Sequence, residues 1–214
     1  MFKLNKKETN VMNIPTIEEA RQLLSEGETL SPGPWVNHSI FTAEAARNIA
    51  IHHREIDPEI AYILGYLHDI GRRSGITDMR HIIDGYNFLI QRGYNDCARI
   101  CLTHSFPLKN LDSFSGNNDC NDEEIIFINK YLTGIDYSVY DELIQLCDAL
   151  TTPKGVCLLE KRFVDMALRS GVNELTVLKW KATFEIKRKF EDVIGRSIYE
   201  LLPGVEENTF LKKN

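Results

Sequence analysis

Signals for the start and the end of helices recur along the whole sequence, and this feature constrains the fold more than any other. The segment TIEE at residues 16–19 has the form of a capping box, and Asp57-Pro58 joins an N-cap to a proline at the first helical position. Alternating runs of β-branched residues bounded by turn pairs are missing. Glycines stand where several helices should end, at Gly27, Gly71, Gly93, Gly171 and Gly195. The sequence therefore predicts an all-α fold.

The same signals predict the positions of nine helices, at residues 17–26, 34–53, 58–71, 79–92, 95–105, 122–132, 139–150, 156–170 and 174–194. The polar stretch 106–121 is interpreted as a surface loop, with a functional lid as the alternative. We expect one domain at residues 16–202, preceded by a flexible N-terminus at 1–15 and followed by a tail at 203–214. Residues 156–202 are expected to add C-terminal helices that complete the core, with a dimer surface as the alternative.

Charge and cysteine content exclude several classes of function. The chain has 31 acidic and 25 basic residues, and its net charge of −6 argues against general binding to a nucleic-acid duplex or to an anionic membrane. It contains no run of 18 apolar residues and no signal-peptide core, so we expect a cytoplasmic protein without a membrane span. The five cysteines include no CxxC pair, which argues against a disulfide framework and a zinc-thiolate site.

Several polar residues fall on helix faces that should be buried. His38 shares a face with Ala45 and Ile49, and His68 and His104 each follow an apolar residue by four positions. Asp148 lies within the apolar string LIQLCDAL, where an unpaired carboxylate would be costly. A satisfied core histidine or a capping aspartate would explain each one separately. Taken together with the adjacent pair His68-Asp69, they form a set of nitrogen and oxygen donors suited to Fe, Mn or Zn.

The order His…His-Asp…Asp in an all-helical chain resembles the HD-domain metal-dependent phosphohydrolases, and HDIG at residues 68–71 is a variant of that family's motif. The resemblance covers about residues 30–155 and implies a single HD-domain helical bundle with extra C-terminal helices. Within the family, the pattern is similar to small bacterial HD hydrolases of the diadenosine tetraphosphatase type. Those enzymes usually have lysine where Arg72 stands, which puts the substrate in doubt.

The resemblance also implies a set of metal ligands. Two divalent ions are expected, with Asp69 bridging them. Fe or Mn is expected first, and Co, Ni, Zn or Mg remain open. The ligands would be His38, His68, Asp69, His81, His104 and Asp148. Two such ions would activate a water and neutralise phosphate oxygens.

Basic residues near the motif are candidates for contacts with an anionic substrate. Arg72 follows the HD pair closely, and we predict that it acts with Asp69 in catalysis by stabilising charge in the transition state. The predicted substrate-binding residues are Arg72, Arg73, Arg99 and Lys109, with Lys154 a weaker candidate. Exposed residues at a helix end are the alternative for the arginine pair.

Three functions follow from this set of residues. The leading hypothesis is a phosphohydrolase that acts on a small phosphorylated substrate, expected to be a nucleotide. The second is a di-iron oxygenase that cleaves a C–C or C–P bond with the same ligands. The third is a non-catalytic module that binds a ligand or a partner.

Overall fold

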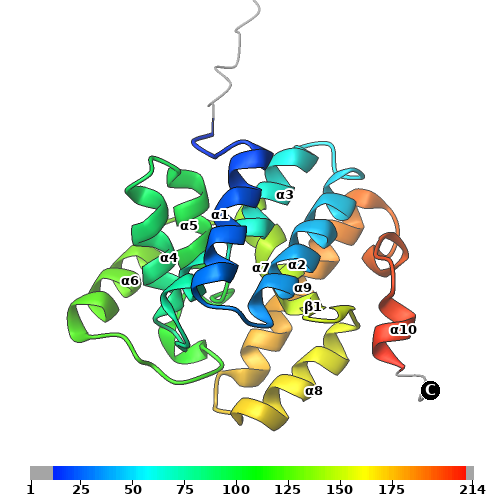
Figure 1. Cartoon of the computed structure of the whole chain (residues 1–214). Helices are drawn as coiled ribbons and strands as arrows, with labels where there is room; N and C mark the ends of the chain where they lie inside the picture. Colours follow the sequence, from blue (N-terminus) through cyan, green and yellow to red (C-terminus); the bar gives the residue numbers. More distant parts are fainter. Residues whose placement is uncertain (1–11, 211–214) are drawn as a thin grey trace, which may run out of the picture.

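The computed structural model describes residues 12–210, and across them the chain is a bundle of helices with one very short hairpin (Figure 1). The predicted all-α fold is confirmed. The α-helices are α1 (Ile17–Leu30), α2 (Trp35–Ala50), α3 (Pro58–Leu67), α4 (His81–Ile90), α5 (Asn95–Thr103), α6 (Asp122–Gly134), α7 (Val139–Leu150), α8 (Leu159–Ser170), α9 (Thr176–Ile194) and α10 (Val205–Thr209). The 3-10 helices are η1 (Ile70–Ser74), η2 (Leu111–Ser113) and η3 (Ile198–Leu201), and the antiparallel strands are β1 (Thr151–Thr152) and β2 (Gly155–Val156).

Several helices begin where their capping residues predict. Thr16 caps α1 in a full capping box with Glu19, and Ser138 does the same for α7 with Asp141. The Asp57 side chain accepts hydrogen bonds from the backbone N–H groups of residues 59 and 60 at the start of α3. These ends are set by local chemistry, so they could be read from the sequence.

Other helix ends differ from the prediction because of tertiary contacts. Gly27 does not end α1. A Cβ atom at Gly27 would lie only 3.0 Å from Cη2 of Trp35, so the glycine leaves room for that ring while the helix continues to Leu30. The third helix ends at Leu67 rather than at Gly71, and residues 70–74 form η1. Residues 152–155, expected only as a break between two helices, form the β1–β2 hairpin together with Thr151 and Val156, so the next helix begins at Leu159 rather than at 156.

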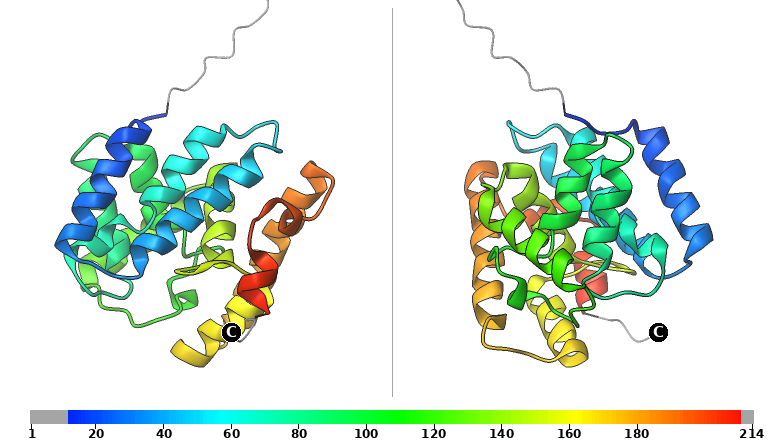
Figure 2. Two further views of the ribbon diagram at one scale, coloured as in Figure 1. Left: turned by 45° about the vertical axis from the view of Figure 1, so that its right-hand side comes forward. Right: turned by 90° about the vertical axis from the view of Figure 1, so that its left-hand side faces the viewer.

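Helices α2 and α3 pack along each other and both contact α7, which lies in the middle of the bundle. On one side α4 packs against α5 and η1. The two views in Figure 2 place α1 and α9 at opposite edges of the molecule, with the other helices between them. The ends of α2, α3, α5 and α7 therefore meet inside the bundle.

The C-terminal helices complete the core. Phe163 on α8 stacks on Trp180 of α9 with ring centroids 5.3 Å apart, and Phe184 contacts Phe163 edge-on. Ile186 and Phe190 of α9 are buried in the same core. Across residues 12–210 no helix is both long and apolar enough to cross a bilayer.

Both ends of the described chain contact the bundle. The backbone N–H of Asn13 donates to the carboxylate of Asp96 at 2.6 Å, so the N-terminal segment contacts α5 at this point. The expected tail contains α10, where Val205 is buried and the hydroxyl of Thr209 accepts a hydrogen bond from the backbone of Leu158. The rest of the predicted flexible N-terminus (1–11) and of the tail (211–214) lies outside the described residues.

Candidate metal centre

The six predicted ligands come from five segments and meet at the centre of the bundle. His38 lies in the first turn of α2, His68 is the C-cap of α3, and Asp69 follows it directly. His81 is the first residue of α4, His104 is the C-cap of α5, and Asp148 is in the last turn of α7. All except Asp148 are buried, and the Asp148 side chain is 26% exposed. Helix ends far apart in the sequence thus place all six side chains in one cluster.

His38, His68 and Asp148 form a first group of ligand atoms. Nε2 of His38 lies 2.8 Å from Oδ1 of Asp148 and 3.3 Å from Nε2 of His68. Nε2 of His68 is 3.8 Å from the same carboxylate oxygen. Ligand atoms of the three residues lie within 4.8 Å of one another, a spacing that one metal ion at roughly 2 Å from each would satisfy.

Asp69 connects this group to a second one. Its Oδ1 lies 3.1 Å from Nε2 of His81 and 3.6 Å from Nε2 of His104, and these two nitrogens are 3.4 Å apart. Its Oδ2 lies 4.0 Å from Nε2 of His68. The Asp69 carboxylate therefore lies between the two groups, as a bridging ligand would.

The outer nitrogens of the histidines are held by oxygen atoms. Nδ1 of His68 lies 2.7 Å from the carbonyl of Gly65, and Nδ1 of His104 lies 3.1 Å from that of Ile100. Nδ1 of His81 bonds to the carbonyl of Asp78. A carbonyl can only accept, so each Nδ1 carries the proton and each Nε2 presents its lone pair to the cluster.

His38 is oriented by a side chain instead. The hydroxyl of Thr151 lies 3.3 Å from Nδ1 of His38 and 2.7 Å from the hydroxyl of Thr42, whose own position is fixed by a bond to the carbonyl of His38. Thr151 and Thr42 are both fully buried. The hairpin that follows Asp148 thus also fixes the ring of its neighbour His38.

Burial and neighbouring charges give the cluster the protonation state of metal ligands. Burial lowers the pKa of His68, and burial together with His68 lowers the pKa of His104 to about 3, so both rings are neutral. Burial alone would raise the pKa of Asp69, but the Arg72 guanidinium holds it well below its ordinary value. The pKa of Asp148 is also lowered, against the effect of burial, by His38. Neutral imidazoles and ionised carboxylates are the forms that bind a divalent metal, so this donor set fits one.

Arg72 is the one predicted cationic residue that reaches the cluster. Its Nε donates to Oδ2 of Asp69 at 2.7 Å, and Nη1 donates to the carbonyl of Thr77 at 3.2 Å. Its Nη2 lies 3.5 Å from Nε2 of His81. The guanidinium is therefore fixed beside Asp69, where a developing negative charge on a phosphate would meet it.

A cavity of about 520 Å³ opens over the cluster. Five of the six predicted ligands line it, while His68 lies behind them. Arg72, Trp35 and Pro34 line other parts of the wall. The volume falls in the range of sites for small organic ligands.

A family model described as the HD domain matches residues 35–152, more than half of the chain, and the match contains all six residues of the cluster. The chain belongs to the HD-domain family. HD-domain proteins are generally metal-dependent hydrolases. No curated protein and no solved structure matched the chain.

Within the HD domain, the structure places two predicted substrate-binding residues away from the cavity. Arg99 donates from Nε and Nη2 to the buried carboxylate of Asp141 at 2.8–3.1 Å. Nζ of Lys109 donates to the carbonyl of Ile135 at 2.6 Å. These side chains hold the ends of α5, α6 and α7 together, so their charges serve the fold.

Two further basic candidates also lie outside the cavity wall. The guanidinium of Arg73 lies over the ring of Phe88, 3.8 Å from its centroid, although it is adjacent to Arg72. Successive residues of η1 point in different directions, and only the first arginine faces Asp69. Lys154 is exposed at the tip of the β1–β2 hairpin.

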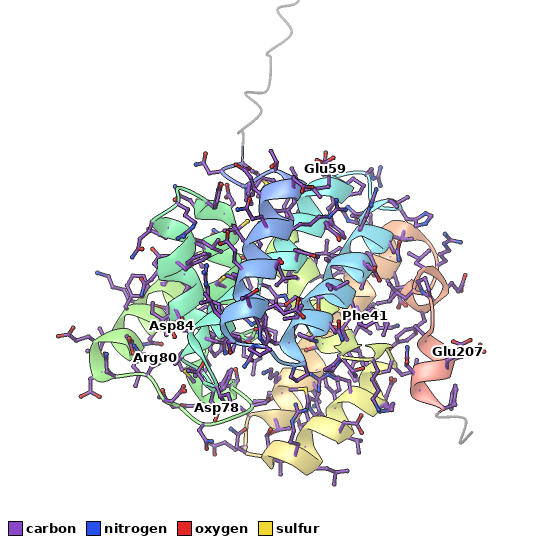
Figure 3. All side chains as sticks on the ribbon, in the orientation of Figure 1. Phe41, Glu59, Asp78, Arg80, Asp84 and Glu207 are labelled. Carbon is purple, nitrogen blue, oxygen red and sulfur yellow. The ribbon has the colours of Figure 1, made fainter. Side chains whose placement is uncertain are left out.

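The 106–121 segment of the HD domain is a wall of the cavity as well as a surface loop. Phe114 and Ser115 line the cavity, and the Phe114 ring lies 6.3 Å from that of His81. The carboxylate of Asp119 accepts hydrogen bonds from the backbone N–H groups of Asp78 and Arg80. Both of these residues, labelled in Figure 3, lie just before the first residue of α4. Asp119 therefore ties this segment to the residues that lead into α4.

Beyond the HD domain, the helices α8 and α9 supply cavity residues that sequence reasoning missed. Arg162 and Arg169 of α8 and Lys179 of α9 line the same cavity. The spacing of four and three residues between Arg162, Met166 and Arg169 places them on one face of the helix. This spacing was the signal in the sequence that could have indicated a shared surface. The signal was weak because no motif links these residues to the ligands.

Proposed function

We propose that the protein is a metal-dependent phosphohydrolase that acts on a nucleotide or another small phosphorylated metabolite. The observation that carries the proposal is the convergence of four imidazoles and two carboxylates on one side of a cavity that also holds Arg72. This arrangement supports hydrolysis because it combines a metal-binding donor set with a fixed cation for the phosphate.

The first group of ligands with Asp69 would hold one ion, and Asp69 with His81 and His104 would hold a second. We infer Fe or Mn as the first candidates, with Co, Ni, Zn and Mg to be tested beside them. When bound, such ions lower the pKa of a water and neutralise phosphate oxygens.

The residues of the chain itself supply position and charge. Asp69 fixes the guanidinium of Arg72 through a bond of 2.7 Å, and Arg72 stabilises the charge that spreads over the phosphate oxygens during attack. In the net reaction, the water oxygen bonds to phosphorus, the bond from phosphorus to the leaving oxygen breaks, and that oxygen takes up a proton. Trp35 and Pro34 offer an apolar surface to the organic part of the substrate.

The test is a screen of the purified protein with each metal against nucleotides, diadenosine tetraphosphate and sugar phosphates, recording both phosphate release and oxygen uptake. Phosphate release without oxygen uptake is the expected result. Oxygen uptake with an iron-loaded protein and no phosphate release would instead identify an oxygenase, and no turnover with any metal would favour a binding module.

Variants connect the activity to the cluster. Asp69→Ala should abolish metal content and turnover, whereas Arg72→Ala should keep the metal and lower the rate of hydrolysis. His52→Ala is the matched control, because His52 is exposed outside the cluster and contacts Arg196. An Asp69→Ala protein with full metal content and full rate would refute the proposal.

A further inference from the structure

We propose that Arg162, Arg169 and Lys179 form a second anion-binding subsite, so that the substrate carries a second phosphate in addition to the one that meets the metal centre. The inference rests on the proposed function for the position of the first phosphate. It narrows the substrate class to bisphosphates and compounds with a polyphosphate chain.

The three cations face the cavity without an anionic partner. Arg162 donates from Nε to the carbonyl of Thr151 at 2.8 Å, and Lys179 donates from Nζ to the carbonyl of Ser113 at 3.1 Å. The side chain of Arg169 makes no hydrogen bond with any residue in 12–210. None of the three has a carboxylate within 4.0 Å in the described part of the chain, whereas Arg72 and Arg99 each have one.

The three charges also act on one another. Burial lowers the pKa of Lys179, and Arg162 lowers it further, against the raising effect of the Asp148 carboxylate. Burial, Arg162 and Arg72 likewise lower the pKa of Arg169, against the raising effect of Asp165. Like charges that converge without a partner are unfavourable for the fold, and a bound anion would relieve the repulsion. This is notable in a chain whose net charge is −6.

The subsite is rigidly connected to the metal centre. Arg162 is held by the carbonyl of Thr151, and the hydroxyl of the same threonine contacts His38. Lys179 is held by the 106–121 loop, whose Phe114 contacts His81. The two anion-binding positions are therefore at a fixed separation within one cavity, which is what recognition of two linked phosphates requires.

Two pairs of small molecules that differ by one phosphate test the subsite. They are fructose 6-phosphate with fructose 1,6-bisphosphate, and adenosine 5′-monophosphate with adenosine 3′,5′-bisphosphate. Binding to the metal-loaded protein is measured by isothermal titration calorimetry, at a low temperature and with phosphate release monitored. Binding can be measured whether or not the protein hydrolyses a ligand, so failure of the proposed function is separable from failure of the subsite.

The wild-type protein should bind at least one bisphosphate about tenfold or more tightly than the matching monophosphate, because charge-assisted contacts add to the affinity. Arg169→Gln and Lys179→Gln should each reduce this ratio, and the double variant should bring it near unity while monophosphate affinity stays within about twofold. Arg169 is exposed, so its variant should fold normally even if Lys179→Gln does not.

Lys181→Gln is the matched control, because Lys181 is exposed on α9 and does not line the cavity. It should leave the ratio unchanged. The proposal is overturned if the wild type binds neither bisphosphate better than its monophosphate, or if the advantage is undiminished in Arg169→Gln. Hydrolysis without a bisphosphate advantage would retain the proposed function and reject the subsite alone.

Discussion

Gly71 lies directly against the backbone of His81. A Cβ atom added to Gly71 would stand 1.9 Å from the carbonyl oxygen of His81 and 2.5 Å from the backbone nitrogen of Gly85. No side chain can occupy that space, so only glycine lets η1 contact the first turn of α4. Since Asp69 immediately precedes η1 and His81 begins α4, this contact brings the two ligands together.

Replacement of Gly71 by alanine should therefore damage the metal centre without removing a ligand. The methyl group forces η1 away from α4, at a cost of about 1–3 kcal/mol or more in the free energy of unfolding. Urea denaturation and metal analysis measure the two effects. Gly134→Ala is the control, because a Cβ atom there meets nothing within 4 Å, and it should keep full metal content. Wild-type stability and metal content in Gly71→Ala would contradict this account.

Thr151→Val should weaken metal binding through the orientation of His38. Valine keeps the volume of threonine but removes the hydroxyl that lies 3.3 Å from Nδ1 of His38. Loss of such an outer contact typically lowers metal affinity by about 10- to 100-fold. Competition with a chelator measures the metal dissociation constant. Thr133→Val, which removes an exposed hydroxyl bonded only within α6, should leave the constant unchanged. An unaltered constant in Thr151→Val would show that His38 needs no such support.

Arg99→Ala should lower stability and leave substrate binding intact. The Asp141 carboxylate is fully buried, and without Arg99 it keeps only the hydroxyl bonds from Thr103 and Ser138 with the local backbone contact. Breaking a buried ion pair typically costs about 3–5 kcal/mol of unfolding free energy, and the exposed edge of Arg99 places this pair at the lower end. Chemical denaturation gives the stability, and steady-state kinetics gives the KM.

Arg188→Ala is the comparison for Arg99→Ala, because Arg188 forms only exposed ion pairs with Glu185 and Asp192. It should change stability very little. A large rise in KM for Arg99→Ala with unchanged stability would show that Arg99 binds the substrate and does not stabilise the fold.

Binding of a bisphosphate should weaken as the pH rises through about 8. Burial lowers the pKa of Lys179 from 10.5 to about 8, with Arg162 lowering it and Asp148 raising it. The lysine is charged below this pH and neutral above it, so raising the pH removes an attraction for the anion. Calorimetry between pH 7 and 9 on the wild type and on Lys179→Gln isolates the effect. An identical pH dependence in the two proteins would exclude Lys179 as the titrating group.

The sequence predicted those parts of the fold that depend on local chemistry. Capping residues such as Thr16, Asp57 and Ser138 form their bonds within one helical turn, so they marked the starts of their helices correctly. The predicted end of α1 at Gly27 was wrong because this glycine accommodates the Trp35 ring, a contact that depends on tertiary packing. The start of the helix predicted at residues 79–92 was also wrong, since α4 begins at His81 and the backbone N–H of Arg80 binds Asp119, 39 residues away along the chain.

Those parts of the candidate site that depend on residue type and on the buried face of a helix could be predicted from the sequence. His38, His68, His104 and Asp148 were recognised because they stand on faces that must be buried, whereas Asp69 and His81 were recognised from the order of a known motif. Arg99 and Lys109 are also cations near the motif in sequence, but the pattern could not show that Asp141 and Ile135 hold them elsewhere. Arg162 and Lys179 were missed for the converse reason, since only the packing of α8 and α9 brings them to the cavity.

The cavity is built by two stretches of chain that could change independently. All six predicted metal ligands lie within residues 35–152, whereas Arg162, Arg169 and Lys179 lie after residue 152. Substitutions in α8 and α9 can therefore alter which molecules are accepted while the ligand frame is conserved. For this chain, the proposal implies that a new specificity is best engineered by substituting the cavity-facing residues of α8 and α9, while their buried residues, such as Phe163 and Phe190, are kept for the core.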